Sequence, residues 1–252
     1  MKEEIKIDIA VVSDIGCIID LVRSSFNEAY LKSSIYRCKG IADFISAELN
    51  NSFSPYKYFV AKMHNKIVGF VEFKIFPQTS TAFLNMIATD NTFKGKGIAT
   101  KIFDFSEKYF REQMYNNIQL DVFKSNEVAR QWYVNMGFIK EKASSFYEQN
   151  LKNSPKDIPD MMILNLSQFN CLYEKFGFSF LQISTLKQSF TLGIIDKNII
   201  VNGDDVSEEI LLTVKSFFKD YNFKTIYYKG QEKNLEKYKY IDEIHRMKLT
   251  LQ

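Results

Sequence analysis

The residue pattern best suited to chemistry is a glycine-rich run at residues 94–100, KGKGIAT. It follows an apolar strand-like segment at 84–89 and opens a segment with helical spacing. Glycine lets the backbone approach an anion closely, and the N–H groups of a first helical turn have no intrahelical acceptor. With the charges of Lys94 and Lys96, the run is a candidate phosphate cradle, and a glycine-rich turn that binds nothing is the alternative.

Two common phosphate-binding motifs do not fit this run. A P-loop, GxxxxGK[ST], is absent from the sequence. A dinucleotide fingerprint, GxGxxG, fails because Thr100 stands in place of its third glycine. The run therefore matches neither of these two classes of phosphate-binding protein.

The spacing of the run instead resembles the [QR]xxGx[GA] loop of the GNAT superfamily of N-acetyltransferases. Gly97 and Ala99 match this pattern, and Lys94 stands where the family has Gln or Arg. A second segment, NEVARQWYVNMGF at 126–138, resembles the family segment NxxAxxxYxxxGF. The strand LDV that precedes it, at 120–122, matches as well.

The resemblance covers residues 1–167 and implies an α/β (α+β) fold in which helices flank a mixed central sheet. The segment LNMIATD at 84–90 lies where the family has a splayed strand that binds acetyl-CoA. Hydrophobic spacing predicts the same order of elements, with Ser13 as the cap of the first helix. The expected strands are 5–11, 58–62, 67–75, 84–89, 118–123 and 161–166, and the expected helices are 13–22, 41–49, 98–109 and 126–136.

The resemblance also implies roles for individual residues. Backbone N–H groups of 95–100 would hold the CoA pyrophosphate, and Ile87 and Thr89 would pair with the pantetheine arm. Asn126 would hydrogen-bond that arm, and Tyr133 would protonate the departing CoA thiolate. The expected cofactor-binding residues are Ile87, Ala88, Thr89, Lys94, Gly95, Lys96, Gly97, Ile98, Ala99, Thr100, Asn126 and Arg130.

The general base is less clear from the sequence. Many family members have a carboxylate on the splayed strand, but this chain has Asn85 there. Glu72 and Asp121 are the available acids, and we take Glu72 as the candidate. Its alternation with apolar neighbours allows it to point into the acceptor cleft, although a solvent-facing strand position is slightly favoured. Removal of the proton through water is a further alternative, and for Tyr133 the alternative is a packing role.

Residues 168–252 resemble a truncated second domain of the same family. Expected strands at 198–201, 224–228 and 241–251 alternate with helices at 206–221 and 233–239. The loop at 202–209 has one glycine and four carboxylates, Asp204, Asp205, Glu208 and Glu209, which would repel a pyrophosphate. We therefore expect a non-catalytic domain that lines the acceptor site or forms a dimer contact.

Composition excludes several classes of function. Lys and Arg number 33 against 30 acidic residues, so no basic excess indicates a nucleic-acid partner. Three separated cysteines and two histidines predict neither a disulfide framework nor a metal centre, and fit a reducing compartment. No apolar stretch is long enough for a membrane span, and residues 1–6 do not resemble a secretory signal. We expect a cytoplasmic protein.

Together these features predict an acetyl-CoA-dependent N-acetyltransferase. The acetyl group would move to a primary amine of a small molecule or peptide by direct attack in a ternary complex, without a metal. The alternative is a non-catalytic module that senses CoA or is purely structural. Residues 1–167 alone are expected to bind the cofactor, and acceptor residues are expected in loops 26–57 and 76–82.

Overall fold

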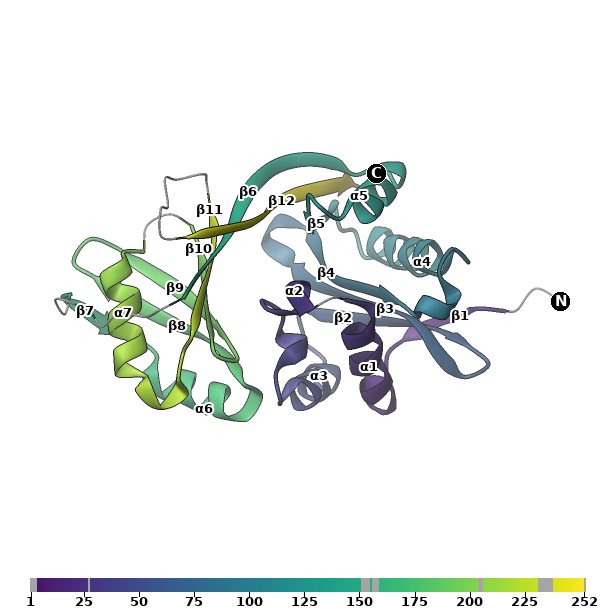
Figure 1. The fold of residues 1–252 in the computed structure, drawn as a ribbon. Helices are drawn as coiled ribbons and strands as arrows, with labels where there is room; N and C mark the ends of the chain where they lie inside the picture. Colours follow the sequence, from purple (N-terminus) through teal and green to yellow (C-terminus); the bar gives the residue numbers. More distant parts are fainter. Residues whose placement is uncertain are drawn as a thin grey trace. The chain divides into compact units, whose positions relative to one another are not determined.

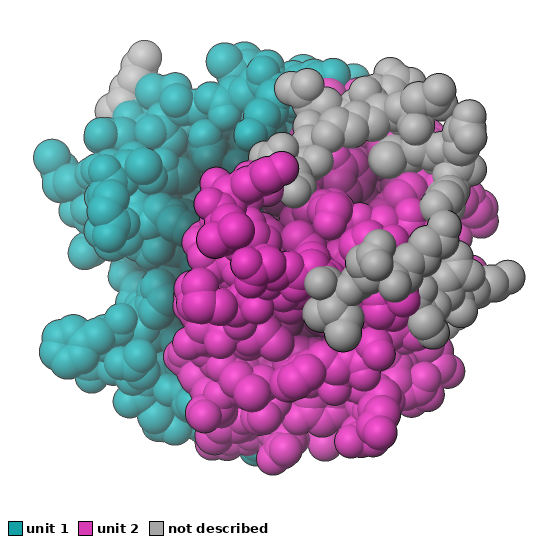
Figure 2. Space-filling model, turned by 90° about the vertical axis from the view of Figure 1, so that its left-hand side faces the viewer, with its two compact units in different colours: residues 1–29, 42–142, 245–252 teal, residues 30–41, 143–244 magenta. Residues whose placement is uncertain are grey.

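The structure is a computed structural model that describes residues 4–26, 28–150, 155, 159–203, 206–230 and 238–251. Figure 1 shows its secondary structure. The chain divides into two compact units, which are distinguished by colour in Figure 2. Unit 1 contains residues 1–29, 42–142 and 245–252, and unit 2 contains residues 30–41 and 143–244.

Unit 1 is built on a mixed sheet with the strand order β1-β2-β3-β4-β5-β12. Neighbouring strands from β1 to β4 are antiparallel, whereas β4 and β5 are parallel. Helices α1 and α3 cover one face and α4 the other (Figure 1). The elements are β1 (Lys6–Ile9), η1 (Val12–Asp14), α1 (Ile15–Ser25), α2 (Glu28–Leu31), α3 (Ile41–Leu49), β2 (Tyr56–Met63), β3 (Lys66–Phe76), η3 (Pro77–Thr79), β4 (Thr81–Thr89), η4 (Asn91–Phe93), α4 (Ile98–Glu112), β5 (Asn117–Phe123) and α5 (Glu127–Asn135).

Most of the expected local structure in unit 1 is confirmed. Helix α3 has the predicted bounds, and His64 and Asn65 form the tight turn between β2 and β3 with positive φ angles of 49° and 62°. Ser13 as a helix cap is wrong. It lies inside the short turn η1, where the Asp14 carboxylate accepts a hydrogen bond from the Val11 N–H at 3.1 Å.

Helix α4 buries one apolar stripe against the sheet. Its buried residues include Ile98, Ile102, Phe103 and Phe110, whereas Phe105 is 38 % exposed. With 3.6 residues per turn, residues 98, 102, 103 and 110 lie on the face of the helix that contacts the sheet, and residue 105 lies at the side of that face. Phe105 still contacts the Phe59 ring edge-on, with 5.6 Å between the ring centroids.

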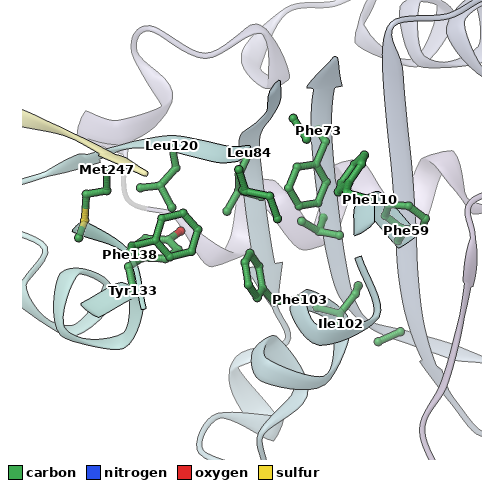
Figure 3. Close-up of a cluster of buried hydrophobic side chains, with 14 of the residues drawn as sticks. Phe59, Phe73, Leu84, Ile102, Phe103, Phe110, Leu120, Tyr133, Phe138 and Met247 are labelled. Atoms are coloured by element: carbon green, nitrogen blue, oxygen red, sulfur yellow. The ribbon is translucent and has the colours of Figure 1, made fainter. Parts of the chain in front are cut away.

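The core of unit 1 lies between α4 and the sheet and is rich in aromatic rings. Figure 3 shows Phe59, Phe73 and Phe110 at one end of this cluster, and Tyr133 and Phe138 at the other. The Phe73 and Phe110 rings meet edge-on with 4.7 Å between centroids, a favoured aromatic geometry. The cluster also contains buried Met247 and Leu251, from the end of the chain.

Unit 2 has the strand order β12-β6-β11-β10-β9-β8-β7. Strands β6 and β12 run through both units, because residues 139–142 and 245–250 belong to unit 1. Helices α6 and α7 contribute to one apolar cluster with the sheet. The elements are η2 (Ile35–Arg37), β6 (Ile139–Asn150), β7 (Met161–Ile163), α6 (Leu166–Phe176), β8 (Phe178–Thr185), β9 (Ser189–Ile195), β10 (Asn198–Asn202), α7 (Glu208–Phe217), η5 (Lys219–Tyr221), β11 (Thr225–Gly230) and β12 (Lys239–Thr250).

Unit 2 follows the sequence expectation in part. Strands β10, β11 and β12 and helix α7 lie where expected, but the β8–β9 hairpin was not predicted. The strand expected at 161–166 ends at Ile163, and the helix expected at 233–239 falls largely outside the described residues. The predicted domain boundary at 167/168 falls inside unit 2.

Candidate functional site

The glycine-rich run forms an open loop at the N-terminus of α4. Gly95 and Gly97 have positive φ angles of 79° and 73°, and Gly97 is the N-cap residue. The first intrahelical bond of α4 joins the Lys101 N–H to the Gly97 carbonyl at 3.0 Å. The N–H groups of 98–100 therefore have no acceptor within the helix. Nothing in the described structure lies within 4 Å of a Cβ placed on either glycine, so the backbone is open to a ligand.

Asp90 anchors the start of this loop. One oxygen of its carboxylate accepts hydrogen bonds from the Thr92 N–H at 2.9 Å and the Thr92 hydroxyl at 2.7 Å. The other oxygen accepts from Lys66 Nζ at 2.8 Å. Hydrogen bonds from Lys66 and Thr92 lower the pKa of Asp90 to about 2. Sequence reasoning missed Lys66, because its place beside the loop depends on the tertiary arrangement of the β2–β3 turn.

Strands β4 and β5 separate beside this loop. They pair from Thr81 opposite Asn117 to Leu84 opposite Leu120, but β4 continues to Thr89. The register of β3 and β4 shifts at Asn85, which leaves this residue as a β-bulge. Beyond the bulge, residues 87–89 pair with β3 and have no β5 partner in the described register. Their free edge can accept an extended ligand, although the Ser25 hydroxyl also donates to the Thr89 carbonyl at 3.1 Å.

The segment that begins at Asn126 lies next to the glycine loop. The Asn126 side chain caps α5 by accepting a hydrogen bond from the Ala129 N–H at 3.2 Å, which leaves its amide nitrogen as a donor. Arg130 Nε is buried and has no hydrogen-bond partner among the described residues. Trp132 donates from Nε1 to the Thr100 hydroxyl at 3.1 Å and so connects α5 to α4. The structure thus brings the two sequence motifs together.

Tyr133 lies in the apolar cluster and is only 6 % exposed (Figure 3). Its ring packs between Trp132 and Phe138, with centroid distances of 4.9 Å and 5.5 Å. Burial raises the pKa of the Tyr133 phenol above its ordinary value of 10. The hydroxyl therefore keeps its proton at neutral pH and can donate it.

Glu72 is buried, at 3 % exposure, so the solvent-facing position favoured from the sequence is wrong. Helices cover both faces of β3, and seven consecutive residues of that strand are buried. Asn85 Nδ2 donates to Glu72 Oε1 at 2.8 Å. The other acid, Asp121, forms a two-pronged ion pair with Arg246, with 3.0 Å between Nη2 and Oδ2. Because this pair occupies Asp121, Glu72 is the better candidate for a base.

The corresponding parallel pair in unit 2 is closed. Strands β10 and β11 pair without interruption from Asn198 opposite Thr225 to Asn202 opposite Lys229. The Gly203 N–H continues the pairing by donating to the Lys229 carbonyl at 2.9 Å. Asp204 and Asp205 lie outside the described residues, while Glu208 and Glu209 occupy the first turn of α7. This strand pair leaves no open edge of the kind that β4 presents.

Two negative findings apply to the described parts of the chain. No group of three or more His, Cys, Asp or Glu side chains is arranged to hold a metal ion there. None of the helices in those parts is long and apolar enough to cross a membrane.

Comparison with known proteins identifies the family of this site. The model of the acetyltransferase (GNAT) family matches residues 18–138, which include the open β4 edge, the glycine loop and α5. These residues belong to the GNAT acetyltransferase family. No curated protein matches the chain.

Solved structures show that the fold extends over the whole chain. A tandem GNAT protein from the clavulanic acid biosynthesis pathway has 10 % identity and a TM-score of 0.71, with 99 % of each chain covered. A candidate acetyltransferase from Pyrococcus horikoshii has 16 % identity and a TM-score of 0.68, with 98 % of this chain and 90 % of the other covered. A GCN5-related N-acetyltransferase from Sphaerobacter thermophilus has 10 % identity and a TM-score of 0.61, with 98 % and 96 % covered. The expected GNAT fold with a second GNAT-like domain is confirmed.

Proposed function

We propose that this protein is an acetyl-CoA-dependent N-acetyltransferase with one cofactor site, in unit 1. The observation that carries the proposal is the free β4 edge at 87–89, next to a helix N-terminus with open glycines and with N–H groups that have no acceptor within the helix. An extended polar arm that ends in a diphosphate matches both features. The arm can form backbone hydrogen bonds with the free β4 edge, and the diphosphate can accept hydrogen bonds from the N–H groups at the start of α4.

The residues of unit 1 fit this cofactor in chemical type. The N–H groups of 95 and 97–100 would bind the diphosphate, since the Lys96 N–H already donates to the Phe93 carbonyl at 3.1 Å. The backbone of Ile87 and Thr89 would pair with the pantetheine arm. The Asn126 amide can donate to the same arm. The buried, unpartnered Nε of Arg130 supplies a positive charge on the same helix. When bound, acetyl-CoA supplies an activated acetyl thioester.

The remaining chemistry belongs to side chains and backbone of unit 1. Tyr133 holds a proton, and we assign to it the protonation of the leaving sulfur. A backbone N–H of β4 near the bulge would donate to the oxygen that becomes negative during attack. Glu72 would accept the proton of the amine, directly or through water. Each of these roles can be tested by changing one residue.

Unit 2 would contribute no second cofactor site in this proposal. Its β10–β11 pair is closed, and the sequence segment 202–209 carries four carboxylates. The unit does hold residues 30–41, part of the region expected to carry acceptor residues. The Gly40 N–H donates to the Phe176 carbonyl at 3.1 Å, and the Arg37 guanidinium pairs with Asp196 at 3.1 Å. We assign to unit 2 the anchoring of this segment.

The test uses the full-length chain. Isothermal calorimetry should show CoA and acetyl-CoA binding, and release of CoA thiol should accompany incubation with some members of a panel of primary amines. Mass spectrometry should find the acetyl group on the nitrogen of the amine. Binding without turnover on any amine would favour the non-catalytic CoA-sensing module, and no binding would refute both.

A further inference from the structure

A small polar cluster lies inside unit 1, next to the bulge of β4. It consists of Tyr58 on β2, Glu72 on β3 and Asn85 at the bulge. Tyr58 and Glu72 are direct cross-strand partners, so their side chains lie on the same face of the sheet. The two residues are 2 % and 3 % exposed, respectively. The cluster therefore places a hydroxyl and a carboxyl group together in a region shielded from bulk water.

The Tyr58 hydroxyl is the unusual member of the cluster. It is buried and has no hydrogen-bond partner among the described residues. Burial, together with the negative charges of Glu72 and Glu48, raises the pKa of Tyr58, so the phenol is neutral. A buried hydroxyl without a partner costs about 1–3 kcal/mol of stability, and such groups in native proteins call for an explanation. Phenylalanine would fill the same space without this loss of stability.

Asn85 separates this cluster from solvent. Its side chain is exposed, and its amide donates to Glu72 Oε1 at 2.8 Å. A neutral amide donor thus lies between the buried carboxyl group and the surface. An ammonium group is a stronger donor to a carboxylate than an amide, because the hydrogen bond is then assisted by charge. A cationic amine could replace the amide as the donor to Glu72.

The position of the cluster agrees with the proposed reaction. The bulge at Asn85 is the point at which β4 leaves β5, and the proposed pantetheine edge begins two residues further along. An amine bound to Glu72 would lie beside the bulge at Asn85, on the face of the sheet that carries Tyr58. The hydroxyl of Tyr58 can accept a hydrogen bond from the ammonium group, and the Glu72 carboxylate can accept its proton, which leaves the neutral amine that attacks the thioester.

We propose that Tyr58 and Glu72 form the binding site for the head group of the acceptor, a cationic primary amine. This inference rests on the proposed acetyltransferase function and deepens it. Tyr58 is a binding residue that selects the acceptor. Its hydroxyl forms a hydrogen bond only when the substrate is bound, and its missing partner lowers the stability of the free protein.

The test compares Tyr58→Phe with the wild-type full-length chain, with Tyr109→Phe on α4 as the matched control. Steady-state rates are measured at saturating acetyl-CoA with whichever amine of the panel is turned over. We expect the KM for the amine to rise at least tenfold in Tyr58→Phe, with kcat changed less than threefold. The control should change neither, and Kd for CoA should be unchanged in both variants.

A second readout does not depend on turnover. Removal of an unpartnered buried hydroxyl should raise the Tm of the free protein, by about 2–4 °C for 1 kcal/mol in a protein of this size. A hydroxyl with a structural role would give a lower Tm instead. In the kinetic assay, Glu72→Gln removes the charge and keeps the shape, so it should raise the KM for the amine and, because Glu72 is also the proposed base, lower kcat as well.

The outcomes separate this inference from the proposed function. If wild-type protein binds CoA and acetylates an amine, but Tyr58→Phe has an unchanged KM or a lowered Tm, the inference is overturned and the function stands. If wild-type protein does not bind CoA or does not acetylate any amine, the proposed function has failed, and the inference fails with it.

Discussion

Arg246, on the last strand of the chain, forms a two-pronged ion pair with Asp121 on β5, with 3.0 Å between Nη2 and Oδ2. The same guanidinium lies over the Phe83 ring, 4.8 Å from its centroid. The hydrogen bond to Asp121 is the main cause that raises the pKa of Arg246, so the guanidinium stays charged throughout the physiological range. The pair connects residues 125 positions apart and ties the C-terminal strand into the sheet of unit 1.

Replacing Arg246 by Ala should therefore destabilise unit 1. It leaves the partly buried Asp121 carboxylate without its two charged donors, which we expect to cost about 1–2 kcal/mol in the free energy of unfolding. Lys248→Ala on the same strand is the control, since Lys248 has a single longer contact of 3.6 Å to Glu141. Urea unfolding should show a clearly larger effect for Arg246. Equal effects would mean that the ion pair contributes little.

Residues 1–167 alone should not form a stable cofactor-binding domain, contrary to the expectation from sequence. Without β12 the β5 edge is uncovered, and the core loses buried Met247 and Leu251. Large-to-small substitutions at single core positions already cost about 2–5 kcal/mol. Circular dichroism and calorimetry on the fragment should show lost structure and no CoA binding. A folded fragment with wild-type affinity would contradict this prediction.

Gly97→Glu should weaken CoA binding by placing a carboxylate at the open loop. Gly97→Ala is the matched control, because both variants bear the same backbone strain at a φ of 73° and only one carries a charge. We expect at least a tenfold greater loss of affinity for Glu than for Ala in calorimetry. Similar affinities in two folded variants would exclude this loop as the diphosphate site.

Tyr133→Phe should slow turnover and spare cofactor binding. A positioned acid typically contributes about 100–10,000-fold, so kcat should fall at least tenfold while Kd for CoA changes little. Because burial raises the pKa of Tyr133, wild-type turnover should not decline through loss of its proton near pH 10. Near-normal kcat in the Phe variant would assign Tyr133 a packing role only.

The Asp90 carboxylate should contribute to stability in a defined pH range. Its pKa is about 2 in the folded chain against an ordinary value of 3.8, so the unfolded chain binds more protons between these values. The contribution is present above about pH 4 and is lost as the pH falls toward 2. Asp90→Asn should therefore lose less stability than wild type between pH 5 and 3, as measured by urea unfolding. Parallel pH curves would show that Lys66 and Thr92 do not favour the charged form.

Calorimetric titration should find one CoA per full-length chain. The closed β10–β11 pair has no free edge for a pantetheine arm, and the four carboxylates of the segment 202–209 disfavour a diphosphate. Gly97→Glu should abolish or weaken the single binding event rather than leave a second one. A stoichiometry of two would require a cofactor site in unit 2.

The features of this protein that depend on local spacing could be predicted from the sequence. Glycines at 95 and 97 before an amphipathic helix, and the motif at 126–138, identified the anion loop and the second helix of the site, because turns and helices are set by nearby residues. The bounds of α3 followed in the same way.

The features that depend on strand register, and on which faces of the sheet are covered by helices, became visible in the folded chain. Glu72 shows the alternation of a half-exposed strand, yet helices on both faces bury it. The same holds for the bulge at Asn85, which depends on the register of β4 against β3. Lys66 contacts Asp90, and Arg246 pairs with Asp121, although the partners lie far apart in the sequence. Residues 245–252 belong to unit 1 although they follow unit 2 in the sequence. The partner of a strand depends on the packing of the whole sheet and not on the residues next to it in the sequence.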